Sequence, residues 1–125
     1  MIRILTEFDN KFFRKIVRQA AKEQMFIPKK NNQFIGYFQE DQLLGMVGFY
    51  AFESTKMIGF VSAYVLPKFR NQGIYKQLSE FRLEHVKEHF KDYSVYVTAN
   101  SNSKHQLENL GFKIIEPQYR MKLDL

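Results

Sequence analysis

The feature that most constrains the fold is a largely apolar run, MIGFVSAYVL, which spans residues 57–66 and ends at Pro67. A run of this kind is typical of a strand that is buried on both faces. The segment that follows, FRNQGIYKQL, leads into an amphipathic pattern with a single glycine, Gly73, at the joint. The sequence therefore predicts a central strand followed, after a short connection, by a helix that begins at Gly73.

The remaining pattern surrounds this unit with further strands and helices. Helical spacing of apolar residues predicts a first helix, capped by Asp9 and running to about residue 24. Glu40 and Asp41 form the expected turn of a hairpin. Gly111 is the expected end of a short helix over 100–110. Strands are expected over residues 2–5, 33–39, 42–52, 93–98, 112–115 and 119–125. We expect a mixed α/β domain with a mostly antiparallel sheet and helices on both of its faces.

Composition limits the setting of this fold. The chain has 125 residues, of which 45% are hydrophobic, so residues 1–125 are expected to form a single domain with a real core. There is no cysteine, which excludes disulfides, thiolate metal sites and a cysteine nucleophile and agrees with a cytoplasmic location. No apolar run approaches the roughly 18 residues that a membrane-spanning helix needs. The net charge is +6, and much of the excess lies on the polar side of the first helix.

The junction at Gly73 has the chemistry of a phosphate site. The first amides of a helix have no partner inside the helix, and the helix dipole makes that end partly positive. A glycine there lets an anionic ligand approach the backbone. Arg70 and the amides of residues 71–75 supply donors, and Lys68 and Lys76 add positive charge. The sequence contains neither a P-loop nor a dinucleotide fingerprint, so other phosphate sites fit less well.

Two motifs together resemble the GNAT superfamily of acetyl-CoA dependent N-acetyltransferases. The pattern [RQ]-x-x-G-x-[GA] after a buried strand is matched by residues 70–75, except that Tyr75 replaces the small residue that the family usually has at the last position. The second pattern, N-x-x-[SA]-x-x-x-Y-x-x-x-G-F, is matched by Asn100, Ser103, Gly111 and Phe112. The order of elements agrees over nearly the whole chain.

The resemblance implies a binding site for coenzyme A. Backbone groups of Val65 and Leu66 would contact the pantetheine arm, the loop that starts at Arg70 would hold the pyrophosphate, and two polar residues would line the far side. The cofactor-binding residues implied in this way are Val65, Leu66, Arg70, Asn71, Gln72, Gly73, Ile74, Tyr75, Asn100 and Ser103. Simpler interpretations stay open, because Gly73 fits a tight turn, Arg70 fits an exposed ion pair, and Asn100 and Ser103 fit helix caps.

The catalytic residues are less well defined. An amine nucleophile must lose a proton, for which Glu53 and Tyr64 are candidates, and a backbone amide near Tyr64 can face the developing oxyanion. The family's tyrosine, which protonates the leaving thiolate, is replaced by Leu107. The candidates to replace this tyrosine as the proton donor are His105 on the same short helix, Tyr119 and a water molecule. His85 and His89 have no third ligand in view, so no metal site is expected.

The leading hypothesis is an N-acetyltransferase that moves an acetyl group from acetyl-CoA to a primary amine of a small molecule or protein by direct attack. The loops 26–33 and 53–56 are expected to select the acceptor. The alternative is a catalytically impaired GNAT-like domain that binds coenzyme A or a protein partner. Nucleic-acid binding by the basic first helix is a third, weaker interpretation, and the segment 119–125 can pair across a homodimer.

Overall fold

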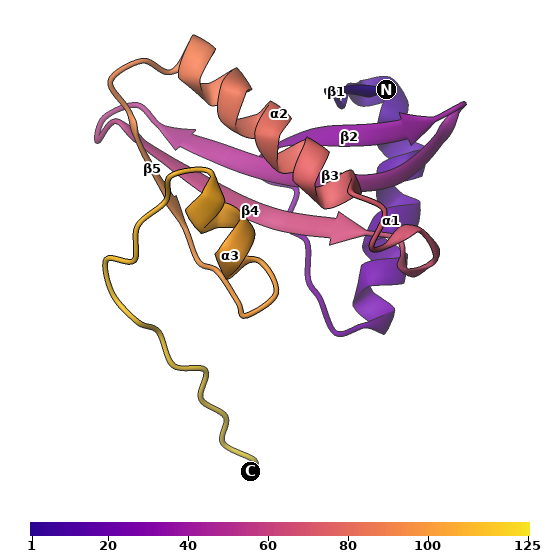
Figure 1. The fold of residues 1–125 in the computed structure, drawn as a ribbon. Coiled ribbons are helices and arrows are strands. Elements are labelled where there is room, and N and C mark those ends of the chain that lie inside the picture. The colour runs from indigo at the N-terminus through magenta and orange to yellow at the C-terminus, as the bar shows by residue number, and fades with distance from the viewer.

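The computed structural model describes all residues, 1–125, and its sheet has helices on both faces (Figure 1). A 3-10 turn, η1 (Glu7–Asp9), precedes the first helix, and a second, η2 (Pro67–Phe69), follows the central strand. The elements in chain order are β1 (Ile2–Ile4), η1, α1 (Asn10–Lys22), β2 (Gln33–Gln39), β3 (Gln42–Phe52), β4 (Met57–Val65), η2, α2 (Ile74–His89), β5 (Ser94–Val97) and α3 (Lys104–Asn109).

The five strands form one sheet in the order β1-β2-β3-β4-β5. The pairs from β1 to β4 are antiparallel, and only β4 and β5 run parallel. Glu40 and Asp41 form the turn between β2 and β3, as predicted. The mixed α/β class and the mostly antiparallel sheet predicted from the sequence are therefore confirmed.

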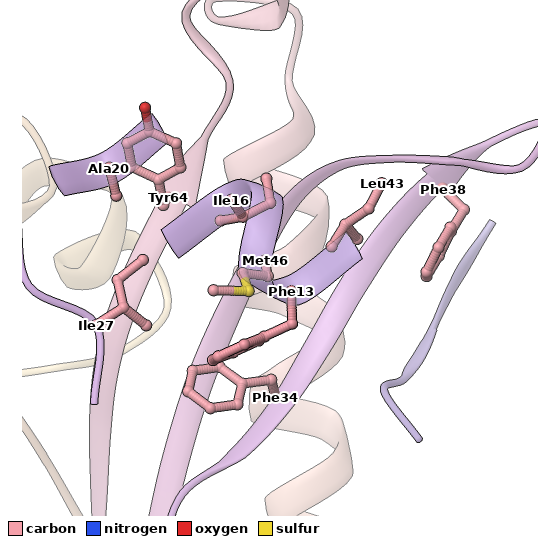
Figure 2. Packing of buried hydrophobic residues seen from close by; sticks show 9 residues of the cluster. All are labelled: Phe13, Ile16, Ala20, Ile27, Phe34, Phe38, Leu43, Met46 and Tyr64. Atoms are coloured by element: carbon pink, nitrogen blue, oxygen red, sulfur yellow. The ribbon is translucent and has the colours of Figure 1, made fainter. Parts of the chain in front are cut away.

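Each face of the sheet carries its own core. Helix α1 packs Phe13, Ile16 and Ala20 against β2, β3 and Tyr64 of β4 (Figure 2). Figure 2 also shows that the Tyr64 ring lies among these apolar side chains while its hydroxyl points away from them. On the other face, α2 buries a second cluster that includes Ile74, Leu78, Val86, Val47 and Phe60. The lysines and arginines of α1 are exposed, so the basic surplus lies on the solvent side of this helix as expected.

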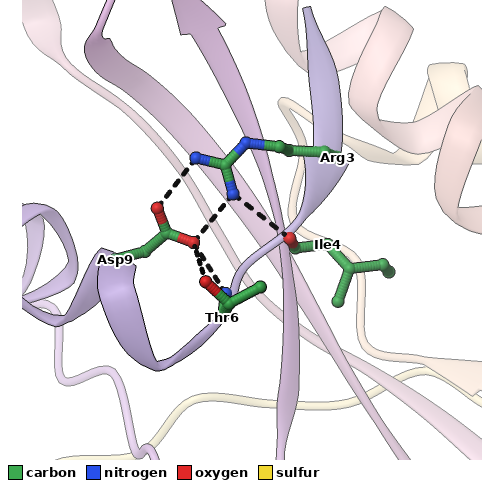
Figure 3. A network of polar contacts seen from close by, with 4 residues as sticks. All are labelled: Arg3, Ile4, Thr6 and Asp9. Atoms are coloured by element: carbon green, nitrogen blue, oxygen red, sulfur yellow. Dashed lines mark hydrogen bonds and ion pairs between the residues drawn. The ribbon is translucent and has the colours of Figure 1, made fainter.

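The role predicted for Asp9 is corrected by the structure. Asp9 precedes α1, but its side chain makes no capping bond to that helix. Instead its carboxylate accepts hydrogen bonds from both terminal nitrogens of Arg3, each at 2.8 Å (Figure 3). It also accepts hydrogen bonds from the Thr6 N–H at 2.6 Å and from the Thr6 hydroxyl at 3.0 Å. Arg3 is close enough to compete for the carboxylate because β1 lies beside the turn. Asp9 therefore fastens β1 to the start of α1.

The two strands predicted over 112–115 and 119–125 do not form. Residues 112–125 have no regular structure. Phe112 still packs against Phe60, and the end of the chain then extends away from the fold, as Figure 1 shows in yellow. Tyr119 is 84% exposed. The alternation of apolar and polar residues over 119–125 does not by itself provide a strand for this segment to pair with. The outer strand β5 has only four residues and so gives a short edge, and Pro117 lacks an amide donor for a ladder. The predicted strands are therefore wrong for this structure.

The helices of the structure include none with both the length and the apolarity that crossing a membrane requires.

Candidate active site

The candidate site is a groove that opens where β4 and β5 separate. The two strands pair only from Met57 with Ser94 to Phe60 with Val97. Beyond Phe60, β4 continues to Val65 without a neighbour on that side, and a cavity of about 1010 Å³ lies there. Its walls come from the end of β4, the start of α2, the end of β5 and α3. The split between parallel strands thus creates the space that a long ligand needs.

The separation of the strands is linked to an irregularity in β4. The pairing with β3 shifts between Met46 and Gly48, and Ser62 has a left-handed backbone with φ of 59°. Arg82 of α2 stabilises this bulge, because its Nη1 donates hydrogen bonds to Gly48 O at 3.0 Å and to Val61 O at 3.4 Å. A bulge bends the strand in which it lies. It therefore turns the end of β4 away from β5.

Arg82 is a buried cation at the floor of the groove. It is 1% exposed, and its guanidinium lies 4.0 Å from the centre of the Phe60 ring. Burial lowers the pKa of Arg82 to about 10, against an opposing effect of Tyr75, so the side chain is still protonated at neutral pH. Its Nε has no hydrogen-bond partner. The ring contact and the two carbonyl bonds compensate part of the cost of burying this charge.

The last residues of β4 turn backbone groups toward the groove. The Leu66 N–H donates to Leu44 O at 2.9 Å. Because hydrogen bonding alternates along an antiparallel pair, the N–H and C=O of Val65 point to the other edge of β4, where β5 has diverged. The Val65 carbonyl there accepts the Nε of Arg70 at 2.8 Å. A ligand in the groove can therefore reach the Val65 amide.

Helix α2 begins at the groove as the sequence predicted. Gly73 is its N-terminal cap residue, with φ of 82°, and Asn71 also has a left-handed backbone with φ of 64°. The first internal bond of the helix runs from Gln77 N to Gly73 O, at 3.1 Å. The amides of residues 74–76 are therefore free for a ligand. Lys76 lines the same side, so this end of the groove suits an anion.

Arg70 connects the two sides of the groove. Its Nη1 and Nη2 donate to the two carboxylate oxygens of Glu23, each at 2.9 Å, and the Tyr64 hydroxyl donates to the same carboxylate. The guanidinium carbon also lies 5.2 Å from the centre of the Tyr64 ring. The alternative of an ion-paired Arg70 is thus what the structure shows. Glu23 follows α1 directly, so this contact joins α1 to the end of β4.

The charges in this cluster follow from its contacts. The Arg70 hydrogen bonds, with a smaller contribution from Tyr64, lower the pKa of Glu23 below its usual value. Burial and then the Glu23 carboxylate raise the pKa of Tyr64 to about 12. At neutral pH the cluster therefore contains an anionic Glu23, a cationic Arg70 and a neutral phenol at Tyr64. Tyr64 is a hydrogen-bond donor under these conditions and not a base.

Helix α3 closes the far side of the groove. The Asn100 side-chain oxygen accepts hydrogen bonds from the N–H groups of Asn102 at 2.9 Å and Ser103 at 3.0 Å, so Asn100 stabilises the turn that precedes α3. Ser103 is the N-terminal cap residue of α3, but its side chain makes no capping bond to the helix. Both Asn100 and Ser103 still line the groove. Leu107 also lines it and is 2% exposed. The position expected to donate a proton to a leaving group is thus a packed leucine.

The structure brings most of the predicted site residues together. Those at the groove are Tyr64, Val65, Arg70, Asn71, Gly73, Ile74, Tyr75, Asn100 and Ser103. Leu66 and Gln72 are not among its lining residues, and neither is His105, which is exposed on α3. Glu53 lies in the turn between β3 and β4, at the end of β4 remote from the groove, as does the whole loop 53–56. Tyr119 lies on the exposed tail.

Glu23 and Met25 line the groove but were missed by the sequence analysis. A signal for Glu23 was present, because it is the only acidic residue between Asp9 and Glu40. It also follows the C-terminal end of α1, where the helix dipole disfavours a negative charge. An anion in such a place requires a partner from elsewhere in the fold.

Comparison with protein families agrees with this architecture. The profile described as the Acetyltransferase (GNAT) domain matches residues 4–122. The chain belongs to the GNAT acetyltransferase family. No curated protein matches the sequence closely enough to count as a relative.

Solved GNAT structures share the fold over their full length. An acetyltransferase of Trypanosoma brucei is 16% identical, with a TM-score of 0.75, and the alignment covers 98% of this chain and 99% of that one. A ribosomal-protein-alanine N-acetyltransferase of Brucella melitensis is 17% identical, with a TM-score of 0.74 and the same coverage. An aminoglycoside N-acetyltransferase in complex with CoA is 16% identical, with a TM-score of 0.72 and full coverage of both chains.

Acetyl-CoA is the cofactor of the GNAT family, and the groove of this member suits it. The free amides at the start of α2, together with Lys76 and Arg70, form the donor set that a diphosphate requires. A Cβ added at Gly73 would come no closer than 4.0 Å to Gln77 Nε2, so the space in front of this backbone is open. Val65 presents backbone polar groups along the route toward the other side.

Proposed function

We propose that this GNAT protein is an N-acetyltransferase that moves the acetyl group of acetyl-CoA to a primary amine by direct attack. The observation that carries the proposal is the groove itself. It has a cationic, amide-rich end at α2 and a wall made of the free end of β4. We further propose that residues 1–125 act as one catalytic domain in the cytoplasm, and that the acceptor is an amine-bearing small molecule or protein.

The cofactor-binding role is proposed for the residues that line the groove. The amides of residues 74–76, Lys76 and Arg70 bind the pyrophosphate, which places the rest of the cofactor along the end of β4. The bound cofactor supplies a thioester carbonyl that a neutral amine can attack. The Val65 N–H stabilises the negative charge that develops on the carbonyl oxygen, because it points into the gap left by β5.

Proton transfer involves a different set of groups. Tyr64 is the one catalytic candidate from the sequence that lies at the groove, and its phenol is neutral. We therefore assign Tyr64 to orienting the acceptor by hydrogen bonding and not to removing its proton. Leu107 has no proton to donate, so water carries both transfers: it accepts the proton that the amine loses and donates one to the leaving sulfur. This route is feasible because thiols are much more acidic than alcohols, with a pKa of about 8.5 for the cysteine side chain, which makes the thiolate a tolerable leaving group.

The test is thiol release from acetyl-CoA in the presence of a panel of primary amines. The panel contains aliphatic diamines, amino sugars and peptides with a free N-terminus, and the reading is the rate above hydrolysis without an amine. Release that saturates with one class of amine supports the enzyme. Binding of the cofactor with no release from any amine supports the alternative of a catalytically impaired binding module, which Leu107 favours.

A further inference from the structure

The two ends of the groove differ in charge. Glu23 is the only acidic residue among the 23 residues that line it. The cations Arg70, Lys76 and Arg82 lie on the side of α2. Arg82 is occupied by the carbonyls of Gly48 and Val61 below the bulge. Arg70, by contrast, binds Glu23 and lies next to the start of α2, so it is the cation between the anion-binding end of the groove and the Glu23 carboxylate.

Glu23 is not available to a cation other than Arg70 in the structure. Both of its oxygens accept bonds from Arg70, and one of them also accepts the Tyr64 hydroxyl. The charge of the carboxylate is neutralised by the guanidinium, so an ammonium group gains little by approaching it. Removal of Arg70 would leave Glu23 as an exposed anion beside a neutral phenol donor.

The pair between Arg70 and Glu23 is suited to exchange. The Arg70 side chain is 39% exposed and the Glu23 side chain 35% exposed. Ion pairs with this much solvent contact contribute little to stability. Arginine binds phosphate oxygens with the same two-pronged geometry that it uses for a carboxylate. Arg70 also lies three residues before Gly73, next to the free amides of α2, so a diphosphate bound there competes with Glu23 for the same guanidinium.

We infer that Arg70 exchanges partners when the cofactor binds, and that the Glu23 carboxylate released by this exchange is the binding site for a cationic acceptor amine. This inference rests on the proposed function and specifies its acceptor as an amine that arrives as an ammonium ion and releases one proton to water before its neutral form attacks. Cofactor and acceptor binding are then coupled, and each raises the affinity for the other. Acceptors that carry no positive charge bind poorly.

The first test measures CoA affinity by calorimetry in the wild type, Glu23→Gln and Glu80→Gln. Glu23→Gln removes the competitor for Arg70 while it keeps the size of the side chain, so we expect CoA to bind about threefold to fivefold more tightly. Glu80 is exposed on α2 and does not line the groove, so the matched control Glu80→Gln removes the same charge and leaves the affinity unchanged. Equal or weaker binding by Glu23→Gln overturns the exchange.

The second test follows the carboxylate itself. Glutamate labelled with ¹³C at the carboxyl carbon reports the ionisation of Glu23 by NMR, with Glu23→Gln to assign its signal. The pKa of Glu23, which Arg70 lowers in the free protein, should rise when CoA saturates the site, as it also should in Arg70→Ala without CoA. An unchanged titration of Glu23 with CoA bound contradicts the exchange while CoA binding itself still stands. Absence of any CoA binding overturns both this inference and the proposed function.

Discussion

Arg70 binds both carboxylate oxygens of Glu23, a residue 47 positions earlier in the chain, with two bonds of 2.9 Å. Its Nε at the same time donates to the carbonyl of Val65 at the free end of β4. One side chain thus connects the end of α1, the end of β4 and the start of α2. Residues at all three places line the groove.

Loss of the Arg70 guanidinium should weaken the cofactor site. Arg70→Ala removes two directed donors beside the α2 amides, and we expect CoA affinity to fall by about tenfold. Arg70→Lys keeps the charge but loses the two-pronged geometry, so its affinity should be intermediate. Calorimetric titration measures both variants. Arg120→Ala, on the exposed tail, is the control for a lost positive charge, and an Arg70→Ala protein that binds CoA like the wild type refutes the role of Arg70.

Substitution of Gly73 should be unfavourable because of its left-handed backbone, although the space around the residue is open. Gly73→Ala forces an L-residue to φ of 82°, which costs about 1–2 kcal/mol and disturbs the amides at the start of α2. Gly111→Ala is a matched control, because Gly111 has φ of 101° and nothing lies within 4 Å of an added Cβ. Both variants should lose similar stability in urea unfolding. Only Gly73→Ala should also lose CoA affinity.

Restoring a hydroxyl at position 107 should affect turnover and not cofactor binding. Leu107→Tyr places a phenol at the wall of the groove, where it can protonate the leaving sulfur, so the rate of thiol release should rise. Leu107 is buried, and the larger ring should reduce the free energy of unfolding by about 1–3 kcal/mol. Leu107→Phe carries the same steric change without the hydroxyl. Equal rates for these two variants would show that a proton donor is not limiting.

The contact between Arg3 and Asp9 predicts a dependence of stability on pH. Arg3 and the Thr6 donors hold the pKa of Asp9 far below its usual value, so its contribution is complete above an unfolded-state pKa of about 3.9 and decreases as the pH falls toward the folded value. Asp9→Asn should cost about 2 kcal/mol at pH 7. Urea unfolding at several pH values should show this difference shrinking below about pH 4. Glu7→Gln is the control, and a difference independent of pH argues against the linkage.

Local features of the sequence predicted most of the fold. Helix α2 and its glycine, the hairpin of β2 and β3, and the apolar stripe of α1 all depend on residues that are neighbours along the chain. The closing strands were wrong because a period of two does not reveal whether a sheet edge is available to pair with. The gap between β4 and β5 depends on a bulge at Ser62, and nothing in the residue type predicts a left-handed backbone there.

The end of the groove at α2 was also more predictable than the end at Glu23. The free amides of α2 follow from one short motif, whereas the cluster of Glu23, Tyr64 and Arg70 joins residues that are far apart in the sequence. Glu53 and His105 were chosen as catalytic candidates for their chemistry and their place along the chain, and the fold places both outside the groove. Such long-range pairs depend on how α1 packs on the sheet, which spacing along the chain does not specify.

The measurement that tests the central claim most directly is calorimetric titration of the protein with acetyl-CoA, with ADP as the control for generic phosphate binding. We have proposed a diphosphate site at α2 and a path for the rest of the cofactor along β4, so we predict saturable binding of one acetyl-CoA per chain and much weaker binding of ADP. Acetyl-CoA that fails to bind, or that binds no better than ADP, would contradict the assignment of this groove to the cofactor.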